Sequence, residues 1–481
     1  MSRAHAGILF SVLVPCALDA QGRGTVFDRS KPPALAKPPV LTVPAVITGV
    51  LGNGVRLQVI EQHELPLVQV TLVVEGGTRL DGPKPGLASF SARMLTEGAG
   101  TRDANALVSE LTFLGANLFA AAQSDVFTLS LNVPKRALGL ALDVMADVAL
   151  RPTFKAVDVK RQRDLRLAGI LQRRDQATTL AAMAFNQLVF PLGHPYHEDA
   201  AGDSASAASL DSATVRSFYE HAFVPRQARF IVVGDVSEPE ARALLAPRFG
   251  TWRTTAAPPP ARVLVKPTVN DTVRVFLVDK PGAAQSVIYL GTPGVERLSP
   301  DYAAIVVMNT ILGGSFSSRL MTNLRETRGY TYGVNSGFRW ARLPGPFVVS
   351  SSVRTNVTDS SLIEIFKELR AIQGVAVDAK ELERAKAYVA LGVPSTLETN
   401  GQIASQLVNL GVFGLPLSSV RALVDRVNTV TGNDVQRVAR QYIPIERLTL
   451  VVVGDLAKIR AGIEGLHLGP VSVLDVSSIA R

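Results

Sequence analysis

An internal repeat is the feature that most constrains the fold of this 481-residue chain. The stretch ARFIVVGDV recurs as RLTLVVVGDL, with Asp235 and Asp455 lying 220 positions apart. Upstream, LVQVTLVVEGGTRL resembles AAQSVIYLGTPGVERL, with Gln69 and Gln285 lying 216 positions apart. Because two separate pairs of segments agree on nearly the same period, we expect two halves of similar structure.

The order of the predicted elements is the same in both halves. Each opens with β-branched strands, continues through amphipathic stretches such as ALGLALDVMADVALRP and SLIEIFKELRAIQG, and ends on a VVGD strand. This pattern predicts an α+β protein with two homologous α/β-sandwich halves, in which helices pack on a mostly antiparallel sheet, arranged like a clam. We expect the halves at residues 45–250 and 268–470, joined by a Pro-rich linker at 251–267.

The N-terminus reads as a secretory signal peptide over residues 1–20. Arg3 supplies a positive charge, AGILFSVLVPCAL a short apolar core and Ala20 a small residue for cleavage, which predicts a periplasmic or secreted protein. A frayed N-terminal extension is the alternative. The only cysteine, Cys16, lies in this segment, and Pro15 before it argues against a lipoprotein anchor. A Pro-rich lead-in follows at residues 21–44, and no apolar run reaches the ~20 residues of a transmembrane helix.

Composition excludes several classes of protein. Hydrophobic residues make up 47% of the chain and charged residues 19%, which is typical of a folded globular protein. The net charge of +9 is spread along the chain, and its densest part, KRQRDLRLAGILQRRD at residues 160–175, is most simply a solvated helical face. Because no aromatic residues are interleaved with these charges, we expect no nucleic-acid partner.

Several motifs together resemble one family. They are NGVRLQVIEQHELPLVQVTLVVEGGTRLD, GLASFSARMLTEGAGT, GHPY, FYEHAFVPRQARFIVVGDV and LGGSFSSRLMTNLRETRGYTYGV. In order and spacing the chain is similar to the pitrilysin and mitochondrial processing peptidase family, the inverzincins, whose zinc motif is HxxEH on a helix. The resemblance covers nearly all of the chain after the lead-in.

The resemblance also shows what the chain lacks. In active members two histidines and a distant glutamate bind zinc, while the glutamate inside the motif is the general base. The corresponding positions here are Ser89, Ala92, Arg93 and, to within one residue, Gly169. Since a hydroxyl is a poor zinc ligand, alanine and glycine offer no donor and arginine is a permanent cation, we expect a degenerate site with no metal and no cofactor.

Other chemistry finds little support in the sequence. In HPYHED, His194, His197 and Glu198 are better explained as loop-packing residues than as metal ligands. The LGGSFSSRL segment lacks the Lys-Ser/Thr of a phosphate loop. A hydrolase that uses Ser89 or Ser91 as nucleophile would have no identifiable base.

The second half contains residues that correspond to substrate-binding residues of the family. Members that cleave peptides use an arginine and a tyrosine, seven residues apart, to hold the peptide backbone and the oxyanion, and LRETRGYTYGV supplies Arg325 and Tyr332. We also expect LVQVTLVVEGG and QSVIYLGTPG to be exposed edge strands, to which an extended peptide could add.

These observations predict the function by resemblance. In heterodimers of this family one subunit carries HxxEH and the other lacks it. We therefore expect the non-catalytic subunit of a heterodimeric zinc metallopeptidase, inactive alone, which binds peptide and contributes Arg325 and Tyr332 to a site whose zinc belongs to a homologous HxxEH partner. The alternative is a peptide-binding or scaffolding protein of the same fold with no role in proteolysis.

Overall fold

The computed structural model describes residues 41–254, 265–267 and 269–480. Leu41–Arg481 forms one compact unit. The predicted signal peptide (1–20), residues 21–40 of the lead-in and the middle of the linker (255–264) lie outside the described residues. The bounds of the two predicted halves stay predictions.

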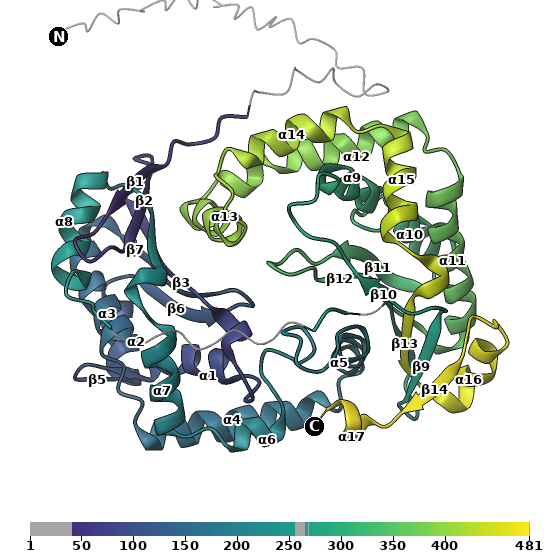
Figure 1. Cartoon of the computed structure of the whole chain (residues 1–481), viewed down its shortest axis with the longest axis horizontal. Helices are drawn as coiled ribbons and strands as arrows, with labels where there is room; N and C mark the ends of the chain where they lie inside the picture. The colour runs from purple at the N-terminus through teal and green to yellow at the C-terminus, as the bar shows by residue number, and fades with distance from the viewer. Residues whose placement is uncertain (1–40, 255–264, 268, 481) are drawn as a thin grey trace, which may run out of the picture. The chain divides into compact units, whose positions relative to one another are not determined.

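Two six-stranded sheets organise the described residues (Figure 1). The strand order is β1-β2-β8-β3-β7-β6 in the first sheet and β11-β12-β10-β13-β9-β14 in the second. The first sheet consists of β1 (Ile47–Val50), β2 (Arg56–Glu61), β3 (Leu67–Glu75), β6 (Asn117–Ala122), β7 (Val126–Pro134) and β8 (Ala228–Gly234). The second consists of β9 (Arg274–Asp279), β10 (Gln285–Pro293), β11 (Thr331–Phe338), β12 (Pro346–Arg354), β13 (Thr449–Gly454) and β14 (Val471–Leu474). A short ribbon, β4 (Gly98–Ala99) and β5 (Arg102–Asp103), stands apart.

The two sheets repeat one topology. Strands β9, β10, β12 and β13 begin 218 to 221 residues after β2, β3, β7 and β8, and they occupy the same places in the strand order. The sheets differ at one edge, because β1 is antiparallel to β2 whereas β14 is parallel to β9. Most of the other pairs are antiparallel. The predicted fold class, two homologous halves with helices on mostly antiparallel sheets, is confirmed.

Helices cover both sheets. The first set is α1 (Leu87–Met94), α2 (Ala104–Phe113), α3 (Leu138–Leu150), α4 (Ala156–Arg173), α5 (Ala177–Val189), α6 (Ser204–Ala208), α7 (Ser212–Ala222) and α8 (Glu238–Phe249). The second set is α9 (Tyr302–Leu312), α10 (Arg319–Met321), α11 (Thr358–Gly374), α12 (Ala379–Gly392), α13 (Asn400–Val412), α14 (Ser419–Thr429), α15 (Gly432–Tyr442), α16 (Leu456–Glu464) and α17 (Val476–Ile479). A π-helical turn, η5 (Thr322–Thr327), follows α10. Among the described helices, none combines the length and apolarity needed to cross a bilayer.

Each half places one helix on the sheet of the other half. Helix α5 packs on β10 and β13 of the second sheet, and its equivalent, α13, packs on β3 and β8 of the first (Figure 1). Every residue of β8 and β13 is therefore buried, since helices cover both faces of these central strands. This exchange explains why the two halves form one compact unit.

The predicted edge strands are wrong. LVQVTLVVEGG contains β3, which is hydrogen-bonded to β7 and β8, and QSVIYLGTPG contains β10, which lies between β12 and β13. Their nearly unbroken burial reflects this central position. The free edges near the predicted sites are β6 and β11.

Candidate functional site

Helix α1 carries Ser89, Ala92 and Arg93 on one side of its two turns. Its start is fixed by Asp81, whose carboxylate accepts hydrogen bonds from the backbone N–H groups of Gly86 (2.9 Å) and Ala88 (2.7 Å). A carboxylate at this end of a helix satisfies free N–H groups and complements the positive end of the helix dipole.

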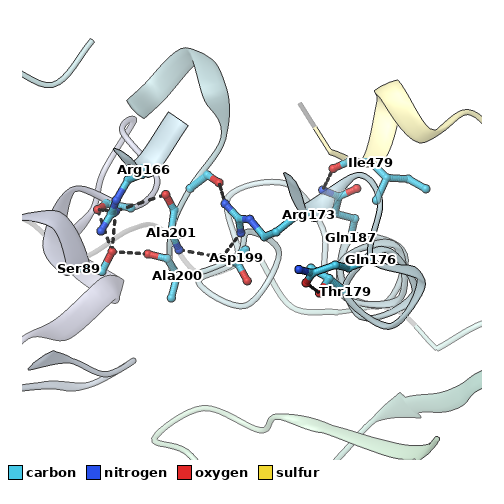
Figure 2. Close-up of polar contacts among 12 residues, drawn as sticks. Ser89, Arg166, Arg173, Gln176, Thr179, Gln187, Asp199, Ala200, Ala201 and Ile479 are labelled. Atoms are coloured by element: carbon cyan, nitrogen blue, oxygen red, sulfur yellow. Dashed lines mark hydrogen bonds and ion pairs between the residues drawn. The ribbon is translucent and has the colours of Figure 1, made fainter. Parts of the chain in front are cut away.

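The side chain that reaches Ser89 is Arg166 from α4 (Figure 2). Its Nη1 donates to Ser89 Oγ and to the Gly86 carbonyl, both at 2.9 Å, and to the Ala201 carbonyl at 3.4 Å. Ser89 Oγ in turn donates to the carbonyl of Ala200 at 2.6 Å. The guanidinium also lies 5.0 Å from the centre of the Phe90 ring. A cation therefore occupies the space beside Ser89.

Arg166 stays charged in this setting. Burial lowers its pKa to about 10, Arg173 acts in the same direction, and Asp81 and Asp199 oppose the shift. A pKa of about 10 leaves the guanidinium protonated at neutral pH. The charged guanidinium thus lies at the junction between α1, α4 and the loop at residues 199–202, with Asp81 and Asp199 as neighbouring carboxylates.

The other predicted zinc positions lie apart from this contact. Ala92 is buried in the core. Arg93 turns outward to Glu97 (3.0 Å), which also pairs with Arg161 at 2.6 Å. Gly169 lies on the exposed side of α4, three residues after Arg166.

The residues present do not fit a zinc ion. Ser89 and Ala92 supply no nitrogen or carboxylate ligand, and the nearest charged group to Ser89 is the Arg166 guanidinium. Within the described ranges, no group of three or more His, Cys, Asp or Glu side chains is placed to hold a metal. No general base stands at residue 92 either, so the chain's own residues do not assemble hydrolytic chemistry here.

Sequence reasoning missed Arg166 because it treated residues 160–175 as a solvated face. Arg173 also turns inward, since its Nη1 donates to Asp199 at 2.5 Å, and Arg163 donates to the Leu210 carbonyl at 3.1 Å. The available signal was the excess of arginine over lysine, because arginine is the cation that suits buried contacts with several carbonyl oxygens.

The loop at residues 199–202 approaches the start of α1 very closely. Gly202 has a φ of +75°, and a Cβ there would lie 2.0 Å from the Pro85 carbonyl oxygen. Gly86, with a φ of +87°, faces it in the same way, since its Cβ would lie 2.5 Å from the Ala201 carbonyl oxygen. Ser206 Oγ adds a hydrogen bond to Pro85 at 2.7 Å. Two glycines thus allow the backbones to meet where Ser89 and Arg166 are joined.

His194 is a buried, uncharged packing residue. Its ring is stacked on Phe190 with centroids 4.6 Å apart, and its Nδ1 accepts a hydrogen bond from the Tyr196 backbone at 3.1 Å. Burial, together with the nearby charge of His197, lowers the pKa of His194 from 6.5 to about 4.

Acid is therefore expected to destabilise the fold through His194. Between pH 6.5 and 4, His194 is protonated in the unfolded chain but stays neutral in the folded protein. The free energy of unfolding therefore falls as the pH drops through this window. The contribution of His194 to this fall is at most about 3 kcal/mol. A His194→Asn variant should lose that part of the slope, measured by urea unfolding at several pH values. His221→Asn, which changes an exposed histidine, is the control and should keep the wild-type slope. Equal slopes in wild type and His194→Asn would contradict the prediction.

Arg325 lies on the π-helical turn η5. Its guanidinium lies 4.5 Å from the centre of the Phe316 ring, and its Nε is 3.4 Å from Glu326, a loose pair at the surface. The turn is closed by the backbone N–H groups of Gly329 and Tyr330, which donate to the carbonyls of Arg325 (3.1 Å) and Leu324 (2.8 Å). π-Helical turns inside helical segments are frequent at functional sites.

Tyr332 stands on the edge strand β11 with 89% of its surface exposed. The pairing of β11 with β12 shifts between Thr331 and Val334, and Gly333 N donates to Thr331 Oγ1 at 3.0 Å within this bulge. A bulge at a sheet edge re-aims side chains, and here it leaves the Tyr332 ring free. A groove of about 310 Å³ beside it is lined by Thr178 and residues of β10, β11 and β12. Among the described residues, no hydrogen bond joins Tyr332 to Arg325, so their joint role stays a prediction.

Family models match both halves of the chain. Residues 57–188 match the model described as insulinase (peptidase family M16), and residues 209–389 match the model described as the peptidase M16 inactive domain. The first match contains Ser89 and Arg166, and the second contains Arg325 and Tyr332.

Curated relatives align over most of their length. An uncharacterized zinc protease of Mycobacterium leprae is 27% identical over 83% of this chain and 90% of its own. A non-peptidase homolog of Helicobacter pylori is 22% identical over 83% and 91%, and the mitochondrial-processing peptidase subunit beta of Lentinula edodes is 22% identical over 84% and 89%. The relatives therefore include both proteases and a protein named for lacking that activity.

A solved structure gives the same assignment. The structure titled peptidase M16 inactive domain from Pseudomonas fluorescens superimposes with a TM-score of 0.77 at 28% identity, covering 85% of this chain and 98% of that one. Together with the two family matches, this shows that the chain belongs to the M16 (insulinase) peptidase family, as an inactive member.

Proposed function

We propose that this protein is the non-catalytic subunit of a heterodimeric zinc peptidase. In this proposal it binds the peptide substrate and offers Arg325 and Tyr332 to a site whose zinc is held by a homologous HxxEH subunit. The observation that carries the proposal is the contrast between the two halves. Arg166 fills the space beside Ser89, whereas Tyr332 is kept on a bulged edge strand with its hydroxyl accessible.

The chemistry of the pair suits this role. The Arg325 guanidinium can donate to peptide carbonyl oxygens, and the Tyr332 hydroxyl can donate to an oxygen that gains negative charge during peptide hydrolysis. Strand β11 has a neighbouring strand on one side only, so an extended peptide can add to its open edge beside Tyr332. The predicted signal peptide leads us to propose a periplasmic or secreted location, where the partner would also be found.

The expected result on purified proteins follows directly. The isolated chain should contain no stoichiometric zinc and should not cleave an internally quenched peptide, because it lacks both ligands and base. Mixed with an HxxEH homologue from the same source, it should form a stable complex that cleaves the peptide faster than the homologue alone. Metal analysis, size-exclusion chromatography and peptide hydrolysis test the three statements.

Two outcomes would overturn this proposal. Peptide cleavage by the isolated chain that a chelator abolishes would place a working metal site in this chain. The scaffolding alternative would be supported if the protein co-purified in a complex without any HxxEH subunit, and if adding it to HxxEH homologues did not change their rate of peptide cleavage.

A further inference from the structure

A second cavity, separate from Ser89 and Tyr332, lies where β1, β2 and β8 meet the end of α13. It has a volume of about 510 Å³. Its polar lining comes from Arg56 and Arg229 on the two parallel strands and from Thr48 and Gln58, which face each other across the β1–β2 pair. Gly411, in the last turn of α13, also lines the cavity.

Arg229 is buried there without enough partners. It exposes 5% of its surface, and neither its Nε nor its Nη2 has a hydrogen-bond partner among the described residues. The guanidinium packs directly on the α13 backbone, since a Cβ on Gly411 would lie 2.4 Å from Nη2. A buried donor left unsatisfied lowers stability, more so on a charged group, so native proteins keep few of them.

Positive charge exceeds negative charge around this position. Arg56 and Arg229 are register partners on neighbouring strands, an unfavourable pairing of like charges. Glu75 lies 3.5 Å from Arg56, 3.9 Å from Arg229 and 3.7 Å from Arg342, so one carboxylate is shared by three guanidiniums. Arg342 has a second acidic neighbour, Asp125, at 3.9 Å. Burial, and to a smaller extent the charges of Arg56 and Arg342, lower the pKa of Arg229, while Glu75 opposes the shift.

We infer that this cavity binds a compact oxyanion, either phosphate or a carboxylate. Arg229 supplies a buried cation in the cavity wall, Arg56 adds a second cation at the exposed side, and Thr48 and Gln58 can complete the contacts with their polar side chains. Because the lining comes from both the first sheet and the end of α13, a bound oxyanion joins elements of the two halves. The inference does not depend on the proposed peptidase role.

Thermal unfolding of the purified full-length protein tests the site. Inorganic phosphate, titrated at constant ionic strength against chloride, should raise the melting temperature saturably, since a ligand that binds only the folded state stabilises it. Malonate is the carboxylate probe, and comparison of the two identifies which oxyanion the cavity prefers. Arg229→Met should weaken the binding of the preferred anion at least tenfold, measured by calorimetry.

Two further variants make the test decisive. Arg56→Gln changes a side chain that is 56% exposed, so the variant should fold normally and weaken anion binding several-fold. Arg384→Gln, on the exposed side of α12, removes the same charge elsewhere and should bind like the wild type. The inference is overturned if neither anion stabilises the protein beyond chloride, or if Arg229→Met and Arg56→Gln both bind as tightly as Arg384→Gln.

Discussion

Replacing Tyr332 by phenylalanine in a reconstituted complex with an HxxEH subunit is expected to lower kcat roughly ten- to thousandfold. The change removes only the hydroxyl, and loss of one oxyanion donor has an effect of that order. Because the ring is 89% exposed and packs into no core, the variant should fold as the wild type does. Arg325→Ala should both lower kcat and raise KM, because a guanidinium that holds peptide carbonyls contributes to substrate binding before and during the reaction.

Matched variants on α12 separate this effect from general damage. Tyr388→Phe removes a hydroxyl from another exposed tyrosine, and Arg384→Ala removes another exposed arginine. Both should leave kcat and KM unchanged. Steady-state kinetics on complexes with verified zinc content give the comparison. If Tyr332→Phe and Tyr388→Phe had the same kcat, the hydroxyl of Tyr332 would have no part in the reaction.

The repeat made the overall fold predictable from the sequence. Two pairs of similar segments separated by nearly the same number of residues imply two sheets of the same topology. In the structure, the counterparts of β2, β3, β7 and β8 are β9, β10, β12 and β13. The exchange of α5 and α13 was not predictable in the same way. The amphipathic pattern of a helix predicts that one of its faces packs on a sheet, but it does not indicate which of two equivalent sheets the helix covers.

The same limit explains the wrong edge strands. A strand buried on both faces and a strand at an edge can both be rich in β-branched residues, and β3 was assigned to an edge although a strand lies on each side of it. The free edge β6 reads NLFAAA, which has a weaker strand pattern, and its Phe119 is exposed. Sheet edges are defined by neighbours in space, which one sequence does not show.

The resemblance predicted a replaced zinc motif at Ser89, Ala92 and Arg93, but it did not predict the side chain that lies beside Ser89. These three are the positions that the family resemblance predicts for HxxEH, and that assignment stays a prediction. Arg166 is 77 residues away from Ser89, and only the packing of α4 against α1 brings its guanidinium to the serine. Arg93, which the sequence suggested as the repelling charge, instead pairs with the buried carboxylate of Glu97.

This junction depends on the close approach of two backbones. Gly202→Ala is therefore expected to destabilise the protein by about 2–4 kcal/mol. An alanine at φ +75° costs roughly 1–2 kcal/mol by itself. The added Cβ would also lie 2.0 Å from the Pro85 carbonyl oxygen, so the loop at residues 199–202 must move away from α1. Urea unfolding measures the total effect, and hydrogen exchange should show lost protection at Ser89 and its neighbours.

Gly193→Ala isolates the contribution of the contact. Gly193 also has a positive φ, +90°, but a Cβ there would meet nothing within 4 Å. Its substitution carries only the conformational term, about 1–2 kcal/mol, and should leave hydrogen exchange at α1 unchanged. Since both glycines lie in the chain between α5 and α6, the difference between the two variants measures how much stability the contact of Pro85 with Gly202 supplies. Equal destabilisation by the two variants would mean that the loop moves without cost and that the contact of Pro85 with Gly202 adds no stability.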